Sequence, residues 1–194
     1  MHWQGSSKLV ALDADPTLAF SRWASGTYEG PAFKTFAETD EARLAHLIAE
    51  QADQADLVLV DTAGFGNRAA TVAMTSADAV LIPALAGEAD ITEAEKTARL
   101  VEGLGRAARR DIPARVLFNR VRRTTLARHA ESELERAKLT RLKASLSDLV
   151  AYGELSYSGR IPTRGTAGVE VETLVAALRQ LGWIPGASRN AVGS

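Results

Sequence analysis

The chain has 194 residues, of which 46% are apolar and 24% are charged, and its formal net charge is −1. This length and composition are typical of one globular domain with a sheet covered by helices on both faces. The absence of cysteine excludes disulfides, thiolate zinc sites and iron–sulfur clusters. No apolar run has membrane-spanning length and no signal peptide opens the chain, so we expect a cytoplasmic protein without a membrane partner.

Basic residues concentrate in the segment 106–143. This segment contains 12 Lys and Arg but only 4 Asp and Glu, a net charge of +8, so the rest of the chain is negative. Such segregation favours binding of an anionic polymer such as DNA on one side of the fold. The alternative interpretation is a solvated helical face, which charge alone favours slightly.

Strands and helices alternate along the first 120 residues, a pattern that predicts an α/β fold with a mostly parallel sheet and helices on both faces. In chain order, we expect strands at 9–12, 32–37, 57–60, 78–83 and 114–119. We expect helices at 18–23, after a capping Thr39, at 68–75 and at 92–109.

The last third of the chain is predicted to be mainly helical. Leucines at 139, 142, 146 and 149 have helical spacing, which favours one or two helices across 126–149. A strand is expected within 150–157, followed by a helix over 171–181 that ends at Gly182. We therefore expect a single α/β domain over 1–183, with a disordered start at 1–7 and a disordered tail at 184–194.

Asp61 ends a buried apolar strand and is followed by Thr62, Ala63 and Gly64. In phosphate-binding folds, a carboxylate at this place holds a metal-bound water opposite the phosphates. A glycine just after it lets the backbone approach the terminal phosphate. The structural alternative is a strand-terminal aspartate that caps the following turn.

Asp13 and Asp15 follow the first strand, two residues apart, and Pro16 comes next. Asp15 has two interpretations of similar weight. It either caps the following helix or orients the water that attacks a γ-phosphate.

Asn119 ends the strand at 114–119, where an amide can recognise both donor and acceptor positions of a base. Its structural alternative is a turn asparagine. The three histidines, His2, His46 and His129, have no metal-ligand spacing.

Taken in order, these segments resemble the ParA family of deviant-Walker partition ATPases, which have a P-loop NTPase fold of the SIMIBI-like type. The resemblance rests on residues 9–16, the Walker B-like segment 56–64, and residues 77–83, 89–91, 116–121 and 160–164. Residues 15–23 and 90–94 are especially similar to the ParA-like branch that assists T-DNA transfer. The wider group also holds MinD, which the tail after Trp183 disfavours, and the nitrogenase iron protein, which the lack of cysteine excludes.

The resemblance implies that Asp15 positions the hydrolytic water, that Asp61 holds Mg²⁺ through water, and that Asn119 contacts adenine. Arg120 and Gly64 belong to the same implied nucleotide site. ATP and Mg²⁺ are the implied cofactors. The implied DNA-binding residues are Arg120, Arg122, Arg123 and Arg164. The implied partners are non-specific DNA, a second copy of the chain, and a ParB-like or relaxosome-type adaptor, in a nucleoid-associated setting.

The chain departs from this family at the phosphate loop, because it contains no Gly-Lys dipeptide. In the family, a strand–loop–helix unit of roughly thirty residues precedes the segment that starts here at Lys8. The resemblance implies that its strand lies beside the one ending at Asp61. Without that strand, ladder hydrogen bonds stay unpaired at a cost of about 1–3 kcal/mol per group.

Two functional hypotheses follow. The first is a ParA-like ATPase of plasmid or chromosome partition or of DNA transfer, a nucleotide-dependent dimer that binds DNA. Under this hypothesis the chain is a truncated form without its phosphate loop and is impaired in hydrolysis as it stands. The second is a non-catalytic module of the same fold that binds DNA or a partner. A third, weaker alternative is an unrelated doubly wound domain that binds a metabolite at its strand ends.

Overall fold

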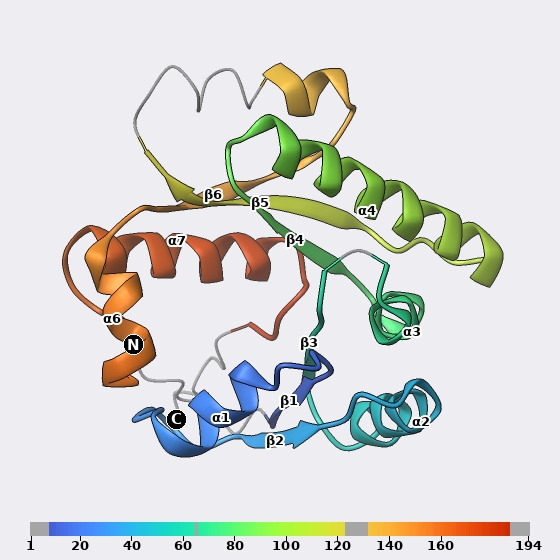
Figure 1. The fold of residues 1–194 in the computed structure, drawn as a ribbon, viewed down its shortest axis with the longest axis horizontal. Coiled ribbons are helices and arrows are strands. Elements are labelled where there is room, and N and C mark those ends of the chain that lie inside the picture. Colours follow the sequence, from blue (N-terminus) through green and yellow to red (C-terminus); the bar gives the residue numbers. More distant parts are fainter. Residues whose placement is uncertain (1–7, 65, 123–131, 187–194) are drawn as a thin grey trace, which may run out of the picture.

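The computed structural model describes residues 8–64, 66–122 and 132–186 (Figure 1). In chain order they form β1 (Leu9–Asp13), α1 (Ala19–Gly26), β2 (Lys34–Ala37), α2 (Glu41–Ala52), β3 (Leu57–Asp61), α3 (Arg68–Ser76), β4 (Val80–Ala84), α4 (Glu88–Ala108), β5 (Ala114–Val121), β6 (Arg141–Ser147), α6 (Val150–Ser158) and α7 (Gly165–Gln180). All four strand pairings are parallel. The predicted α/β class is thus confirmed. Within the described ranges, no helix combines the length and apolarity needed to cross a membrane.

The strands form two separate three-stranded sheets, in the orders β2-β1-β3 and β4-β5-β6. Figure 1 shows the second sheet above the first. The division falls between β3 and β4, which follow each other in the chain. Each of these two strands pairs with only one described strand, so each leaves one edge without a ladder partner. This is the place where the sequence resemblance puts the strand of the phosphate-loop unit.

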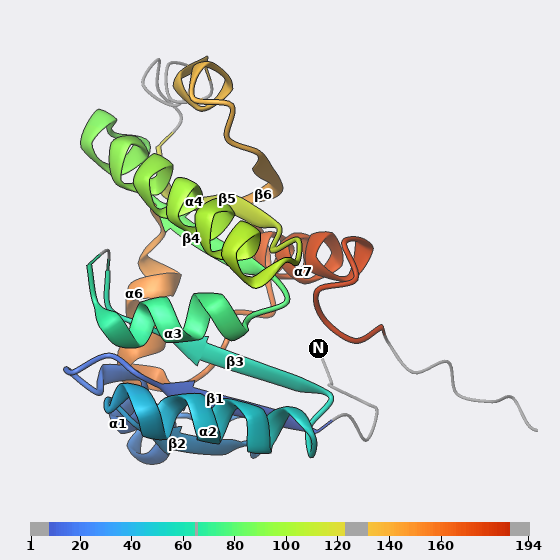
Figure 2. The same cartoon turned by 90° about the vertical axis from the view of Figure 1, so that its right-hand side faces the viewer.

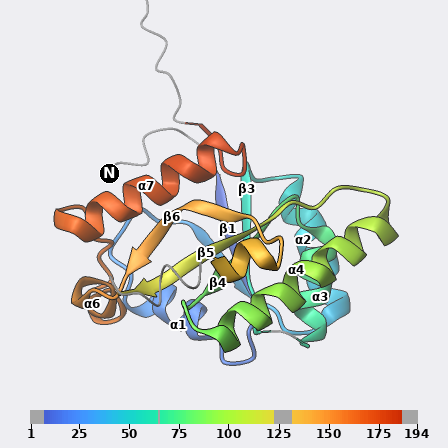
Figure 3. The ribbon, with the colours of Figure 1, turned by 90° about the horizontal axis from the view of Figure 1, so that it is seen from above.

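The second sheet is covered by helices on both faces, which Figures 1 and 3 show from two directions. On one face, Ile91 and Ala94 of α4 pack against strand residues that include Ile82 and Val116. On the other face, Leu142 and its neighbours pack against α7. The alternating side chains of a central strand explain both layers, since successive residues of β5 point to opposite faces.

The first sheet is packed on one face and partly open on the other. Val10, Leu12, Val58 and Val60 belong to one apolar cluster with residues of α2 and α3. Leu59, between the two valines of β3, points to the opposite face and is 48% exposed. Strand β3 therefore has both an uncovered face and an unpaired edge.

Helix α3 connects the two halves of the molecule (Figure 2). Ala69 and Ala73 belong to the core of the first sheet. Ala70 and Met74, one residue further along the helix in each case, belong to a cluster with Val101 of α4. A second connection runs from α1 to α6, where the indole Nε1 of Trp23 donates to the carbonyl of Leu155 at 3.0 Å.

Three predictions about the elements were wrong. Residues 141–147, predicted to be helical, form strand β6, and residues 150–158, expected to contain a strand, form helix α6. The cap of α2 is Asp40 rather than Thr39, since its side chain accepts from the backbone N–H of Arg43 at 2.9 Å. The predicted end of α7 at Gly182, which has a φ of +71°, is confirmed.

Candidate functional site: the carboxyl edges of the two sheets

Strands β1 and β3 bring two of the predicted acids side by side. Asp13 and Asp61 are register partners in the parallel pair, and the N–H of Ala14 donates to the carbonyl of Asp61 at 2.8 Å. Both strands are apolar up to their last residue, so each delivers its acid to the same edge. β1 is buried as expected, but no residue of β3 is fully buried, because one face and one edge of this strand are uncovered.

Asp13 is the most deeply placed of these acids, with none of its surface exposed. Its two carboxylate oxygens accept from the N–H of Ser21 at 2.7 Å and from the N–H of Asp15 at 3.2 Å. Asp13 therefore fixes the turn after β1 and the start of α1. The sequence indicated Asp13 only as a neighbour of Asp15. The sequence pattern did not predict that the Asp13 side chain is buried.

Asp15 lies at the surface of the same turn. Its Oδ1 accepts from the N–H of Thr17 at 2.7 Å, and the hydrogen bonds from Thr17 hold the pKa of Asp15 below its usual value. The N-cap of α1 is Leu18, in the left-handed region at φ 49°, so Asp15 forms an Asx turn before the helix and does not cap it directly. Thr17 contributes both its backbone N–H and its side chain to the hydrogen bonds of Asp15. The water-positioning role of Asp15 stays a prediction.

The pKa of Asp61 is raised, first by burial and then by the negative charges of Asp13 and Asp15. Its side chain is nevertheless partly open to solvent. A carboxylate that lies near two others and is open to solvent favours binding of a cation, because the cation offsets their negative charge. Within the described part of the chain, no three His, Cys, Asp or Glu residues lie close enough to hold a metal ion together. The donor set fits Mg²⁺ bound by one carboxylate through water.

Gly64 follows Asp61 in an open turn. A β-carbon at Gly64 would meet no atom within 4 Å, and its φ is not in the left-handed region. Neither packing nor backbone conformation therefore requires glycine at this position in the described structure. Its predicted role in the approach of a phosphate is untested.

Asn119 lies on the other sheet, near the carboxyl end of β5. The strand continues two residues past it, to Val121, with an irregular register against β6. The Oδ1 of Asn119 accepts from the N–H of Arg120 at 2.9 Å, and Arg120 has a left-handed φ of 51°. This local bond is the turn role of an asparagine, and it leaves the amide nitrogen as a donor for a ligand.

Two of the predicted DNA-binding arginines share one carboxylate. Asp148 accepts from Nε of Arg120 at 3.2 Å and from Nε of Arg122 at 2.8 Å, and these bonds lower its pKa. Arg164 is exposed immediately before α7, and Arg123 lies outside the described residues. Asp148 was not predicted as a site residue, because a helix was expected over 126–149, whereas Asp148 directly follows strand β6.

The acids thus meet at the carboxyl edge of the first sheet, and Asn119 with Arg120 and Arg122 lies at the carboxyl edge of the second. Nothing in the described residues forms a cradle of glycine amides and lysines for a triphosphate. The residues present fit Mg²⁺ held through water at Asp61, but they do not fit a bound triphosphate by themselves.

Solved structures with the same arrangement define the class of fold as that of the MinD- and ParA-type ATPases. An ATP complex of a McdA variant from Cyanothece has a TM-score of 0.72 and 15% identity, over 95% of this chain and 88% of that chain. MinD from Pyrococcus horikoshii with Mg-ADP has a TM-score of 0.67 and 16% identity, over 91% and 85%. A plasmid partition protein from Borrelia burgdorferi has a TM-score of 0.63 and 11% identity, over 90% and 86%.

The sequence model of one family, described as VirC1 protein, matches residues 5–163. The match covers most of the chain, and so the chain belongs to the VirC1 family. This confirms the resemblance to the ParA-like branch of T-DNA transfer. No curated protein compared with the chain matches it.

Proposed function

We propose that this protein is the ATPase-fold component of a DNA-transfer or partition system. In this proposal, the chain provides the acid half of a nucleotide site, and a strand–loop–helix unit provides the phosphate cradle. The observation that carries the proposal is the set of three carboxylates at the carboxyl edge beside β3, whose other edge is unpaired. Family membership supports the same function.

Each proposed role uses an atom that the structure leaves available. Asp61 holds the water shell of Mg²⁺, because its carboxylate is partly open to solvent and is flanked by like charges. Mg²⁺, when bound, supplies charge that neutralises the phosphates. Asp15 orients water with its carboxylate, which the N–H of Thr17 holds in place and which is partly exposed. Asn119 presents its amide nitrogen to a base, with Arg120 beside it, and Gly64 leaves room for a phosphate.

The division of the sheet supports a cradle supplied by a further unit. A parallel strand between β3 and β4 would pair with both open edges and would make one continuous sheet. Its loop would then lie at the carboxyl edge, next to Asp61. Binding of non-specific DNA, assembly into a nucleotide-dependent homodimer, docking of a ParB-like or relaxosome-type partner and nucleoid association belong to the same proposal, and they rest on the family alone.

The test is calorimetry with Mg-ATP on the chain alone and on the chain extended at its amino end by a strand, a glycine–lysine loop and a helix. We expect no binding to the chain alone and binding to the extended chain. Asp15→Ala should then abolish hydrolysis and retain binding, whereas Asp61→Asn should weaken binding in Mg²⁺ more than in EDTA. A folded extended chain that does not bind Mg-ATP would exclude the proposal.

The second candidate is a non-catalytic module that binds DNA or a partner. The specific observation in its favour is that the described residues form a packed fold without any phosphate cradle. Under this hypothesis, DNA binding by the full chain is independent of Mg-ATP, of the added unit and of Asp15. The same set of proteins, assayed for DNA binding with and without Mg-ATP, separates the two candidates.

A further inference from the structure

The described part of the basic segment 106–143 does not form one surface. Strand β5 runs through it, with Ala114 at its amino end and Val121 at its carboxyl end. Arg120 and Arg122 lie at the carboxyl end, where Asp148 offsets one of their two positive charges. The amino end of β5 lies at the opposite edge of the sheet from Asn119. This edge also holds the last turn of α4 and the turn before β6.

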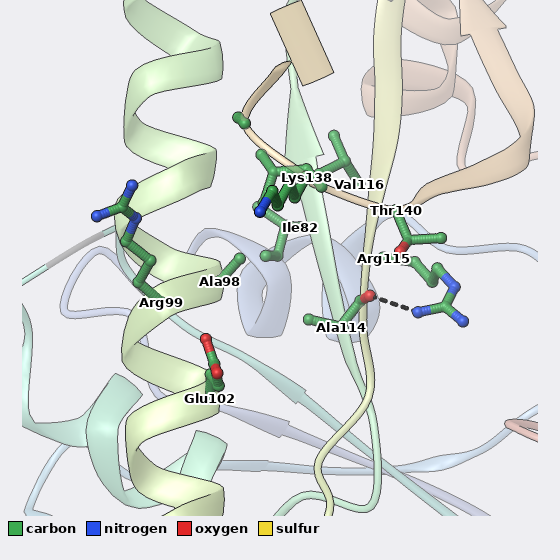
Figure 4. A pocket seen from close by; sticks show the side chains of 11 residues that line it. Ile82, Ala98, Arg99, Glu102, Ala114, Arg115, Val116, Lys138 and Thr140 are labelled. Atoms are coloured by element: carbon green, nitrogen blue, oxygen red, sulfur yellow. Dashed lines mark hydrogen bonds between the residues drawn. The ribbon is translucent and has the colours of Figure 1, made fainter. Parts of the chain in front are cut away.

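Two adjoining cavities lie at this amino edge, one of about 330 Å³ and one of about 660 Å³. They share Ala98 and Glu102 of α4 and Ala114 of β5, so they form one continuous hollow along the helix. Figure 4 shows Arg99 and Glu102 on the helix side and Ala114 and Val116 on the strand side. Six Lys and Arg residues line the hollow, against the two acids Glu102 and Asp111.

Two of these cations, one in each cavity, have no partner for their charge among the described residues. Arg109 lines the larger cavity and Lys138 the smaller one. Both are exposed, and neither side chain has a hydrogen-bond or ion-pair partner within the described ranges. By contrast, Arg99 pairs with Glu95 and Arg106 pairs with Glu102 on the same helix. Among the described residues, Arg110 and Arg115 contact only backbone carbonyls, which leave their charge uncompensated.

The backbone at both positions is unfavourable for a long side chain. Arg109 and Lys138 each have a φ of +56°, the left-handed conformation in which glycine or asparagine is usual. A cation near the end of a helix is favourable to the helix dipole, which is the structural explanation for Arg109. That explanation does not require the left-handed residue itself to be the cation, because Arg106 already lies in the last turn.

We propose that this hollow at the amino edge of β5 binds the phosphodiester backbone of DNA, with Arg109 and Lys138 as the main contacts. An open hollow with uncompensated cations along its length suits a chain of phosphates that contributes no sequence information. It also keeps DNA away from Asp13, Asp15 and Asp61, whose negative charges repel phosphates. DNA and a nucleotide can then be bound at the same time, at opposite edges of the fold.

The inference rests on the DNA-binding part of the proposed function and assigns it to other residues than Arg120, Arg122 and Arg164. The decisive variant is Arg109→Gly/Lys138→Gly, because glycine suits a positive φ and removes both charges without distorting the backbone. The matched control is Lys34→Gln/Arg68→Gln, which removes two exposed cations that do not line the hollow.

The measurement is fluorescence anisotropy of a labelled mixed-sequence duplex with the full chain, over a series of salt concentrations. Thermal melting of every variant shows that it is folded. We expect the glycine variant to bind more than about ten-fold more weakly at low salt, and its log–log salt slope to fall by about 2. Its melting temperature should stay near that of the wild type, and the control should bind like the wild type.

Two results would overturn the inference in distinguishable ways. If the wild type binds DNA and the folded glycine variant binds as tightly as the control, the hollow is not the site, and the DNA-binding proposal survives with other residues. If the wild type, with or without the added unit and Mg-ATP, binds no DNA at any salt concentration, the DNA-binding part of the proposed function fails together with the inference.

Discussion

Carboxylates at a shared sheet edge are costly to hold together when no cation is bound. Asp13 is buried and uses its oxygens to fix the start of α1, so it cannot move away from Asp61. The pKa of Asp61 is raised because burial and the neighbouring negative charges disfavour its ionised form. A site of this kind gives up some stability in exchange for affinity toward a cation.

Replacing Asp61 by asparagine should therefore stabilise the protein at neutral pH. The folded-state pKa of Asp61 lies above its reference value of 3.8, so its ionisation destabilises the fold at every pH above the folded pKa. We expect Asp61→Asn to melt at a higher temperature than the wild type at pH 7 without Mg²⁺. The difference should disappear as the pH falls through the raised pKa to 3.8. Thermal melting over this range measures it.

The exposed Asp78, which has no hydrogen-bond partner in the described structure, is the control. Asp78→Asn should leave the melting temperature unchanged at both ends of the pH range. An Asp61→Asn variant that melts below the wild type at pH 7 would contradict the proposed repulsion.

At the residue scale, the sequence predicted where the acids lie, but it did not predict the surroundings of the arginines. Apolar strands that end at Asp13 and Asp61 predict a parallel pair with both acids at one edge, and the register confirms this arrangement. The environment of Arg120 depends on Asp148, which is 28 residues away in the chain. No local pattern contains that contact.

At the scale of elements, β6 shows why a leucine pattern misled the prediction. Leu142 and Leu146 are four residues apart, a spacing that fits one helical turn and also two full repeats of a strand. In the structure Leu142, Ala144 and Leu146 all face α7, which is the strand period. Ala144, between the two leucines, completes the strand period. Because alanine is small, the larger leucines dominated the pattern and favoured a helix.

Helix α6 gave the opposite error. Its valine and two tyrosines favour a strand by propensity, and none of its residues is buried. Tertiary hydrogen bonds hold it as a helix, including those of Leu155 with Trp23 and of Tyr152 with Glu170. Such contacts override weak local preference.

Glu170 joins three elements and should be important for stability. From α7, its carboxylate accepts from the N–H of Ser147 at 2.9 Å, from the Oγ of Ser147 at 2.5 Å and from the hydroxyl of Tyr152 at 2.8 Å. Glu170→Ala leaves these donors unpaired, so we expect a loss of about 2 kcal/mol in the free energy of unfolding. Denaturant titration measures it, and the exposed Glu172→Ala on the same helix should cost far less.

The same network provides a spectroscopic check. Burial, the hydrogen bond to Glu170 and its negative charge raise the pKa of Tyr152. In Glu170→Gln, the charge is lost and Tyr152 should ionise at a lower pH, as followed by ultraviolet absorbance. An unchanged titration would show that Glu170 does not contact this tyrosine.

At the scale of the whole molecule, two half-sheets with separate cores act as one unit mainly through α3. Met74 packs with Val101 of α4, whereas Leu44 is buried within the first core alone. Both truncations to alanine should destabilise the protein, by about 2–5 kcal/mol for a well-packed site. Only Met74→Ala should also broaden the transition and lower the denaturant slope, because it weakens the coupling between halves. Equal slopes for both variants would show that α3 does not carry the coupling.

The central claim is that the open edges of β3 and β4 form the place of a further strand and its phosphate loop. Hydrogen exchange of backbone amides tests it most directly, on the chain alone and on the chain extended by a strand–loop–helix unit. In the chain alone, we predict protection throughout the interior strands β1 and β5 and fast exchange of alternate amides in β3 and β4. In the extended chain, those amides should become protected. Full protection of β3 and β4 in the chain alone, or no change on extension, would contradict the account.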